Sequence, residues 1–405
     1  DDMTDRVPTP GKEGRVKLTF DDESVQYAKI EMADEPTQEG TPLNKATLLS
    51  DSTAEILGFG ADDDPTVNDA FLAVMVNGGE FCLVTVHVYE TGTTTPIPGV
   101  LITGLTSLSG GEVYADENGR AIAKSESSTA TVRVSPYYVD LTSSAVTVQT
   151  PIGTIIDLNI YATRVSNTST KEVTVTSTQT FMFTDRVASV DVHVVGGGNG
   201  GDRGSASYNG GGHYTMGASH GNGGRAGGQS YKTGIKPTAN YKYIATIGLG
   251  GDGLSQTTEN TSDDHYAISY KSGNKGGNSS FMGVSANGGS GESGGTGYWY
   301  YYDSDPDETD EGGGTSGTSS TVGKYGTGSV VAGGGGGGAG GTNGYAGGTP
   351  YGGKGGKAGA AGSNATGYGG GGGGGGVVNT AFSSATAYAS GDGGDGVVFF
   401  RWRYN

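Results

Sequence analysis

The chain has 405 residues, of which 81 are glycine, and its formal net charge at pH 7 is −18. A charge this negative repels phosphate backbones and no lysine or arginine cluster offsets it, so we expect no nucleic-acid binding. The single cysteine, Cys82, excludes an intrachain disulfide and a cysteine-based zinc site, and no apolar run is long enough for membrane insertion.

Glycine and charge are distributed unevenly. Residues 1–165 contain 14 of the 81 glycines and residues 166–405 contain the other 67, while residues 1–80 carry 18 acidic against 6 basic side chains. This shift in composition predicts a domain boundary between 163 and 170. We therefore expect a mainly β, multidomain chain with an acidic N-terminal part (1–80), a middle part (81–165) and a glycine-rich part (166–405).

The acidic N-terminal part contains little that could form a core. Residues 15–20 alternate in hydrophobicity and predict one strand, and residues 27–32 predict an extended arm that needs a partner surface. Capping residues and apolar spacing predict short helices, which alone cannot build a core, so we expect this part to dock on another protein or on copies of itself. The predicted helices cover residues 42–49, 51–58 and 67–76, the last with Thr66 as its capping residue.

The middle part alternates apolar and polar residues in short runs separated by turn residues, such as Asp116 to Gly119. This spacing is typical of a β-sandwich. Cys82 fits a small apolar position at the start of its first strand. The predicted strands cover residues 83–89, 96–103, 112–115, 120–123, 131–134, 145–149 and 154–161.

The glycine-rich part begins with alternating strands at 171–176, 178–183 and 189–195, and it ends in the apolar strand 396–402. Between these strands lie uninterrupted glycine runs, at 196–198, 333–338 and 369–376. A linker would not need such bracketing strands, so we expect the glycine runs to lie inside a folded domain. The alternative is low-complexity disorder, which glycine and serine tracts without a strict period commonly indicate.

Polyglycine II is one ordered conformation that such runs can adopt. It is a left-handed helix of about three residues per turn without internal hydrogen bonds, so its amides are free to bond to neighbouring helices. Because glycine has no Cβ, several such helices can lie side by side with every amide paired. We expect a slab of packed backbone helices whose side chains are confined to loops at its ends.

The segment from residue 297 to 311 combines five aromatic residues with six acidic ones, flanked by glycine. Burying it would bury the aspartates, so we expect a surface loop. Tyrosine and tryptophan offer rigid contact area with polar tips and can stack on sugars; the alternative is that they only shield the slab. The candidate binding residues are Tyr298, Trp299, Tyr300, Tyr301, Tyr302, Asp303, Tyr208, His213, Tyr214, His265, Tyr266 and Tyr270, with His220, Asp263 and Asp264 nearby. We expect the histidines to be solvated loop residues and not metal ligands.

No motif specifies a catalytic centre or a cofactor. Asp303, Asp305 and Asp307 match the start of a calcium loop, but Glu308 stands where the loop requires glycine and Gly314 stands where it requires glutamate. Residues 391–396 match part of a calcium-binding repeat only once. We therefore expect no metal, no cofactor and no enzyme activity.

The N-terminal part, the middle part and the glycine tracts each resemble a known family. Residues 6–10, 38–49 and 64–71 look like the N-terminal segment of tail-fibre or tail-tip proteins of phages and prophages of Gram-positive bacteria. Residues 82–123 are similar to carboxypeptidase-regulatory-like or collagen-binding-B-type sandwiches, which act in such chains as spacers or carbohydrate-adhesion modules. The glycine tracts resemble in layout the adhesins at the fibre tips of T-even-like phages, where packed polyglycine helices carry host-contacting loops.

These resemblances imply a receptor-binding protein of a virion. Residues 1–80 would attach to other tail or baseplate proteins, residues 81–165 would act as a spacer, and the glycine-rich tip would bind a glycan or protein on the host surface. The family implies a homotrimer located at the tail tip or fibre, made in the host cytoplasm and released by lysis. The alternatives are a purely structural tail or decoration protein without a receptor, and a depolymerase, for which no catalytic set is recognisable.

Overall fold

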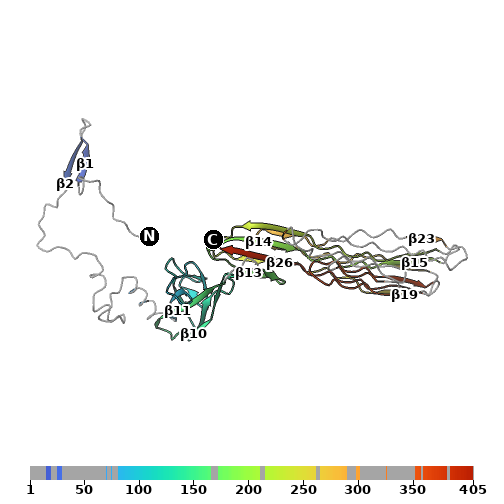
Figure 1. The fold of residues 1–405 in the computed structure, drawn as a ribbon, viewed down its shortest axis with the longest axis horizontal. Helices are drawn as coiled ribbons and strands as arrows, with labels where there is room; N and C mark the ends of the chain where they lie inside the picture. Colours follow the sequence, from blue (N-terminus) through green and yellow to red (C-terminus); the bar gives the residue numbers. More distant parts are fainter. Residues whose placement is uncertain are drawn as a thin grey trace. The chain divides into compact units, whose positions relative to one another are not determined.

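The computed structural model describes residues 15–19, 25–29, 70, 74, 81–165, 172–209, 215–260, 265–289, 298–301, 325, 352–356, 359–380 and 384–404 (Figure 1). Contacts divide the chain into two units, Asp1–Gly79 and Glu80–Asn405. The described part is mainly β, with several separate sheets.

In the first unit, β1 (Arg15–Thr19) pairs antiparallel with β2 (Val25–Lys29). The strand predicted at 15–20 is confirmed, and the segment predicted to be extended from residue 27 begins within β2, where Tyr27 lies opposite Lys17. The segment pairs with the preceding strand because a short connection makes a hairpin the nearest way to satisfy its amides. The helices predicted at 42–49 and 51–58 lie outside the described residues; in the third, Ala70 and Val74 are helical.

Residues 82–164 form two sheets that share one hydrophobic core. One sheet has the order β5-β7-β3-β11-β9 and the other β10-β8-β4-β6. Alternate residues of the strands face this core, which buries Val84, Val86 and Val88 completely together with Ile160 and Val132. The strands are β3 (Cys82–Glu90), β4 (Leu101–Thr103), β5 (Thr106–Ser107), β6 (Val113–Tyr114), β7 (Arg120–Ser125), β8 (Thr129–Val134), β9 (Leu141–Ser143), β10 (Val146–Gln149) and β11 (Ile155–Arg164).

Each run predicted to be a strand in this part contains one, although the run 96–103 forms a strand only from Leu101. Cys82 is the first residue of β3 and is completely buried, as expected. The strands β5 and β9 were not predicted, since two or three residues are too few to show an alternating pattern.

The strands that bracket the glycine tracts pair with one another. The central pair of the sheet β12-β26-β14-β17 joins the chain before the glycine tracts to the chain after them, with Val194 opposite Val398. Two-stranded sheets β13-β18 and β21-β22 complete a second core of aromatic residues, including Phe183, Phe281 and Phe400. The strands are β12 (Val173–Val175), β13 (Gln179–Phe181), β14 (Val187–Val195), β17 (Gln229–Ile235), β18 (Tyr243–Ala245), β21 (Ser279–Phe281), β22 (Val284–Ala286) and β26 (Val397–Tyr404).

The core of residues 82–164 and the aromatic core of the glycine-rich part meet at a hydrogen-bonded junction. Met182 belongs to the core of residues 82–164, and its amide donates to the carbonyl of Tyr137 at 2.8 Å. The Tyr138 hydroxyl accepts a hydrogen bond from the Leu101 amide at 3.0 Å and donates to Asn240 Oδ1 at 2.8 Å. These contacts join residues 82–164 to the first strands of the glycine-rich part.

Buried Asp140 adds a polar link at the same junction. Both the amide and the hydroxyl of Thr184 donate to its carboxylate. Burial raises the pKa of Asp140 above its ordinary value, and the Thr184 hydrogen bonds only partly oppose this shift.

Beyond β14 the backbone bonds to its neighbours with a period of three residues. From Gly196 to Arg203, successive backbone amides donate hydrogen bonds to three different segments of the chain in turn, so that every third amide bonds to the same segment. The N···O distances of the hydrogen bonds that these eight amides donate are 2.8–3.0 Å. Gly196, Asn199 and Asp202 donate to the carbonyls of Gly228, Arg225 and Asn222; Gly197, Gly200 and Arg203 donate to those of Gly277, Asn274 and Lys271; Gly198 and Gly201 donate to those of Gly394 and Gly391.

Close backbone contact explains why glycine is required in these segments. A Cβ added at Gly198 would lie 1.9 Å from the carbonyl oxygen of Gly370, and one at Gly374 would lie 2.0 Å from that of Gly221. No flexible side chain is present at either contact to move aside. The run 333–338 lies outside the described residues, whereas 196–198 and 369–376 are ordered segments of this packed backbone.

Two further sheets lie at the opposite end of the glycine-rich part from β14 and β26 (Figure 1). We call the sheet β20-β15-β16-β23 the distal sheet. Its buried residues Ala206 and Ile268 pack with Val377, Ala385 and Ala387 of the neighbouring sheet β19-β25-β24. The strands are β15 (Ser205–Asn209), β16 (Thr215–Ser219), β19 (Thr257–Asn260), β20 (His265–Ile268), β23 (Tyr298–Tyr301), β24 (Val377–Thr380) and β25 (Ser384–Ala387).

Candidate binding site

The distal sheet brings together predicted binding residues that are far apart in the sequence. Tyr208 of β15 lies opposite Tyr266 of β20 on one side and Met216 of β16 on the other. Met216 in turn lies opposite Tyr300 of β23. His265 lies next to Tyr266, so three of the predicted groups share one sheet.

The expectation of a loop is wrong for Tyr298 to Tyr301, which form β23 and pair with β16. Tyrosine and tryptophan favour the pleated, half-buried surface of a sheet, and the free edge of β16 supplies a partner that the sequence does not reveal. Tyr302, Asp303, His213, Tyr214, Asp263 and Asp264 lie outside the described residues.

The position predicted for Tyr208 on an exposed loop is also wrong. Its side chain is 5% exposed and belongs to the core beneath the distal sheet, where it packs with Ala206 and Ile268. Strand alternation turns this residue inward. Tyr208 therefore supports the sheet and is not available for a ligand.

Tyr270 and His220 are held by hydrogen bonds instead of lying free in solvent. The half-buried Tyr270 hydroxyl donates to Asp202 and accepts from Asn222 Nδ2 at 2.9 Å; burial first, then Asp202, raises the pKa of Tyr270 above its ordinary value. His220 was expected in solvent but is 3% exposed, and its Nδ1 accepts from the Val377 amide at 2.9 Å. Burial lowers the pKa of His220 to about 4, so this imidazole is neutral at pH 7.

Cross-strand rows of the distal sheet alternate between its two faces. The row of Ser207 also contains Ala267, Gly217 and Trp299. Ala267 is exposed and Ser207 is half-buried, in contrast with Tyr208 of the next row. Tyr301 lies two residues from Trp299 in β23, so these two residues occupy rows of the same parity.

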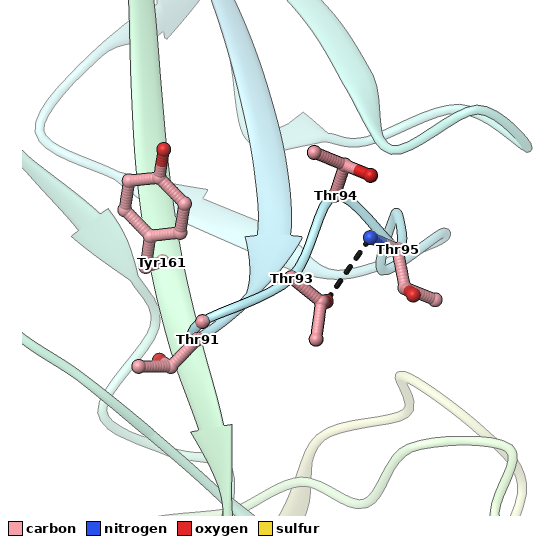
Figure 2. Close-up of a pocket in the computed structure, with 6 residues that line it drawn as sticks. Thr91, Thr93, Thr94, Thr95 and Tyr161 are labelled. Carbon is pink, nitrogen blue, oxygen red and sulfur yellow. Dashed lines mark hydrogen bonds between the residues drawn. The ribbon is translucent and has the colours of Figure 1, made fainter.

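A second candidate surface, which the sequence analysis missed, lies on the five-stranded sheet of residues 82–164. An open hollow of about 800 Å³ is lined by Tyr161 of β11 and by the loop Thr91 to Thr95 that follows β3. Figure 2 shows the Tyr161 ring on its strand, beside the threonine-bearing loop. Two features of the sequence could have indicated this surface: the threonine run at 93–95 and the aromatic residues at outward-facing strand positions.

Metal-binding geometry is absent from the described ranges: they contain no group of three or more His, Cys, Asp or Glu side chains that could hold an ion. The aspartates of residues 391–396 instead bond to backbone amides. Asp392 accepts from the Gly253 amide and Asp395 from the Gly250 amide, both at 2.7 Å. Across the part of the chain that is described, helices capable of crossing a membrane are not found.

Comparison with known proteins identifies a family model that covers the glycine-rich part. No curated protein matches the chain by sequence. A family described as a glycine-rich domain matches residues 174–403, which is more than half of the chain and includes the bracketing strands, the packed backbone segments and the distal sheet. The chain therefore belongs to the glycine-rich domain family.

Proposed function

We propose that this protein is a phage tail-fibre or tail-tip receptor-binding protein that attaches the virion to the surface of its bacterial host. The observation that carries the proposal is the aromatic strand β23 at the edge of the distal sheet, at the end of the glycine-rich part away from β14 and β26. An edge strand rich in tyrosine and tryptophan gives a rigid contact surface of low conformational entropy.

The proposed contact surface consists of the cross-strand row that contains Ser207 and the exposed Ala267, and of the rows on the same face of the sheet. Trp299 and Tyr301 belong to these rows, together with His265, whereas Tyr300 lies in the row of the buried Tyr208. The receptor would be a glycan or a protein of the cell surface. Several copies per particle would raise the avidity without requiring tight single sites.

The proposal includes an architecture for the remainder of the chain. The glycine segments would be packed polyglycine II-like helices, supported by the three-residue period of their hydrogen bonds. Residues 81–165 would be a β-sandwich spacer, supported by two sheets around one core, and residues 1–80 would attach to other tail or baseplate proteins. Copies of the chain would assemble as a homotrimer.

The test measures adherence of the labelled full-length protein to cells of a panel of Gram-positive bacteria by flow cytometry. The double variant Trp299→Ser and Tyr301→Ser is compared with Tyr231→Ser, a matched control whose tyrosine is 47% exposed on β17. We expect saturable adherence that is lost in the double variant and retained in the control, with unchanged circular dichroism.

Other outcomes separate the alternatives. If the folded protein adheres to no strain, or adheres equally well after the double substitution, the proposed site is wrong and a structural tail or decoration role is favoured. Unfolding of the double variant would assign these residues to support of the slab. Adherence is then measured with the single variant Tyr301→Phe, which keeps the ring and removes the hydroxyl.

A further inference from the structure

We propose that the hollow beside Tyr161 is a second binding site, which takes the sugar rings of a neutral polysaccharide chain. This site lies on residues 82–164 and is independent of the distal sheet. It would make the middle part of the chain an adhesive module in its own right.

Three rings form a row on the outer face of the five-stranded sheet. His87 and Tyr89 of β3 are stacked, with ring centroids 6.2 Å apart and planes 4° apart. Tyr89 lies opposite Tyr161 in the parallel pair β3-β11, with ring centroids 6.2 Å apart. Tyr161 is 47% exposed, so the row ends in a ring whose apolar surface meets solvent.

The loop beside this ring is built to remain in place. The Glu90 amide donates to the Thr95 carbonyl at 2.9 Å, and the Thr91 amide donates to the Ala162 carbonyl of β11 at 3.0 Å. The Thr93 hydroxyl donates to the Glu90 carbonyl at 3.1 Å and accepts from the Thr95 amide at 3.1 Å. A loop held at both ends and in the middle presents its exposed threonines without a large ordering cost on binding.

The threonines supply the polar half of the site. The side chains of Thr91, Thr93, Thr94 and Thr95 are exposed. A threonine hydroxyl can both donate and accept, and that of Thr93, which already donates to the Glu90 carbonyl, can still accept. A pyranose ring presents an apolar face of C–H groups and a rim of hydroxyls. The ring of Tyr161 can stack on the C–H face, and the threonine loop can form hydrogen bonds with the hydroxyl rim.

Charge and shape narrow the ligand class. Asp157, whose side chain is 77% exposed, lies near the row, and the Arg164 Nε is already bonded to Glu90 Oε1 at 2.9 Å. The residues that line the hollow, Thr91 to Thr95 and Tyr161, carry no charge, which suits an uncharged polymer. Because the hollow is open, it fits a chain laid across it better than a small ligand that must be enclosed.

The test uses the full-length protein and saturation-transfer NMR with cellohexaose, maltohexaose and chitohexaose as neutral probes and polyglutamate as the anionic control. We expect weak binding of at least one hexasaccharide and none of polyglutamate. Tyr161→Ala should lower the affinity by about tenfold or more, since it removes the stacking ring. The matched control is Tyr114→Ala, which removes a tyrosine that is 42% exposed on β6 of the other sheet.

Each result decides the proposal. If no neutral hexasaccharide binds, or if binding survives Tyr161→Ala in a folded protein, the site is refuted. If Tyr161→Ala unfolds the protein, Thr94→Val removes one hydroxyl without removing the ring and must weaken binding. The double variant at Trp299 and Tyr301 should keep its hexasaccharide affinity, so failure of the distal site and failure of this one are distinguishable.

Discussion

Gly276 faces the backbone of Gly197 so closely that an added Cβ would lie 2.0 Å from the Gly197 carbonyl oxygen. The neighbouring residue of the same segment, Lys275, is exposed. Two adjacent positions therefore differ completely in the space available to a side chain. This contrast allows the packing of the glycine segments to be tested by single substitutions.

We expect Gly276→Ala to destabilise the glycine-rich part strongly, because backbone lies at the site of the clash and no side chain can yield. Lys275→Ala should change the free energy of unfolding by about 0.5 kcal/mol or less, as exposed substitutions usually do. Urea unfolding of both variants measures the difference. Equal stability of the two variants would show that the segments do not pack as closely as the structure has them.

Tyr138→Phe tests the junction between the two cores. The substitution leaves the buried Leu101 amide and the half-buried Asn240 Oδ1 without their hydroxyl partner, which should cost about 1–3 kcal/mol. Tyr137→Phe is the control, because Tyr137 is 41% exposed and its ring remains available to Lys242. The free energy of unfolding from urea titration should fall only in the first variant.

Asp191→Asn tests the pH dependence of stability. Burial favours the neutral form of this carboxyl, but the Gly234 amide and the guanidinium groups of Arg401 and Arg403 outweigh it and lower the pKa of Asp191 below its ordinary value. The folded state therefore binds fewer protons than the unfolded state, whose carboxyl has a pKa of about 3.9. Stabilisation by Asp191 is complete above this pH and is lost as the pH falls through the lower, folded-state value.

We expect the Asn variant to lose about 1–3 kcal/mol at pH 7, since its hydrogen bonds to cations weaken. The difference from the unsubstituted protein should narrow at pH 3. Unfolding in urea at both pH values checks this, with Glu117→Gln at an exposed turn as the control. A difference that stays constant from pH 7 to pH 3 would contradict the role of the Asp191 charge.

Cys82 should be inert in the folded protein. Its thiol is completely buried at the start of β3, with Sγ 3.3 Å from Thr154 Oγ1. Because only the exposed thiolate reacts, a disulfide reagent should label the chain only as residues 82–164 unfold. Labelling that proceeds rapidly without denaturant would show that the first strand of this part opens in the native state.

The strands were predictable where alternation runs for four or more residues. Residues 83–89 and 189–195 show the period of two, and both are strands. The short strands β5 and β9 have no such pattern, because tertiary pairing alone defines them. The role of Tyr208 could not be predicted, since an isolated tyrosine among polar residues does not reveal which face of a sheet becomes buried.

The sequence by itself favoured a folded domain around the glycine tracts over a flexible linker, because apolar strands bracket these tracts. It also determined the mainly β class, through local alternation. Only the tertiary structure decided which segments lie against Gly196 to Arg203, since glycine has no side chain to specify a partner and each amide bonds to a carbonyl far along the chain. The same holds for β23: its residues favour a strand, but the edge of β16 that makes them one is formed by a distant part of the sequence.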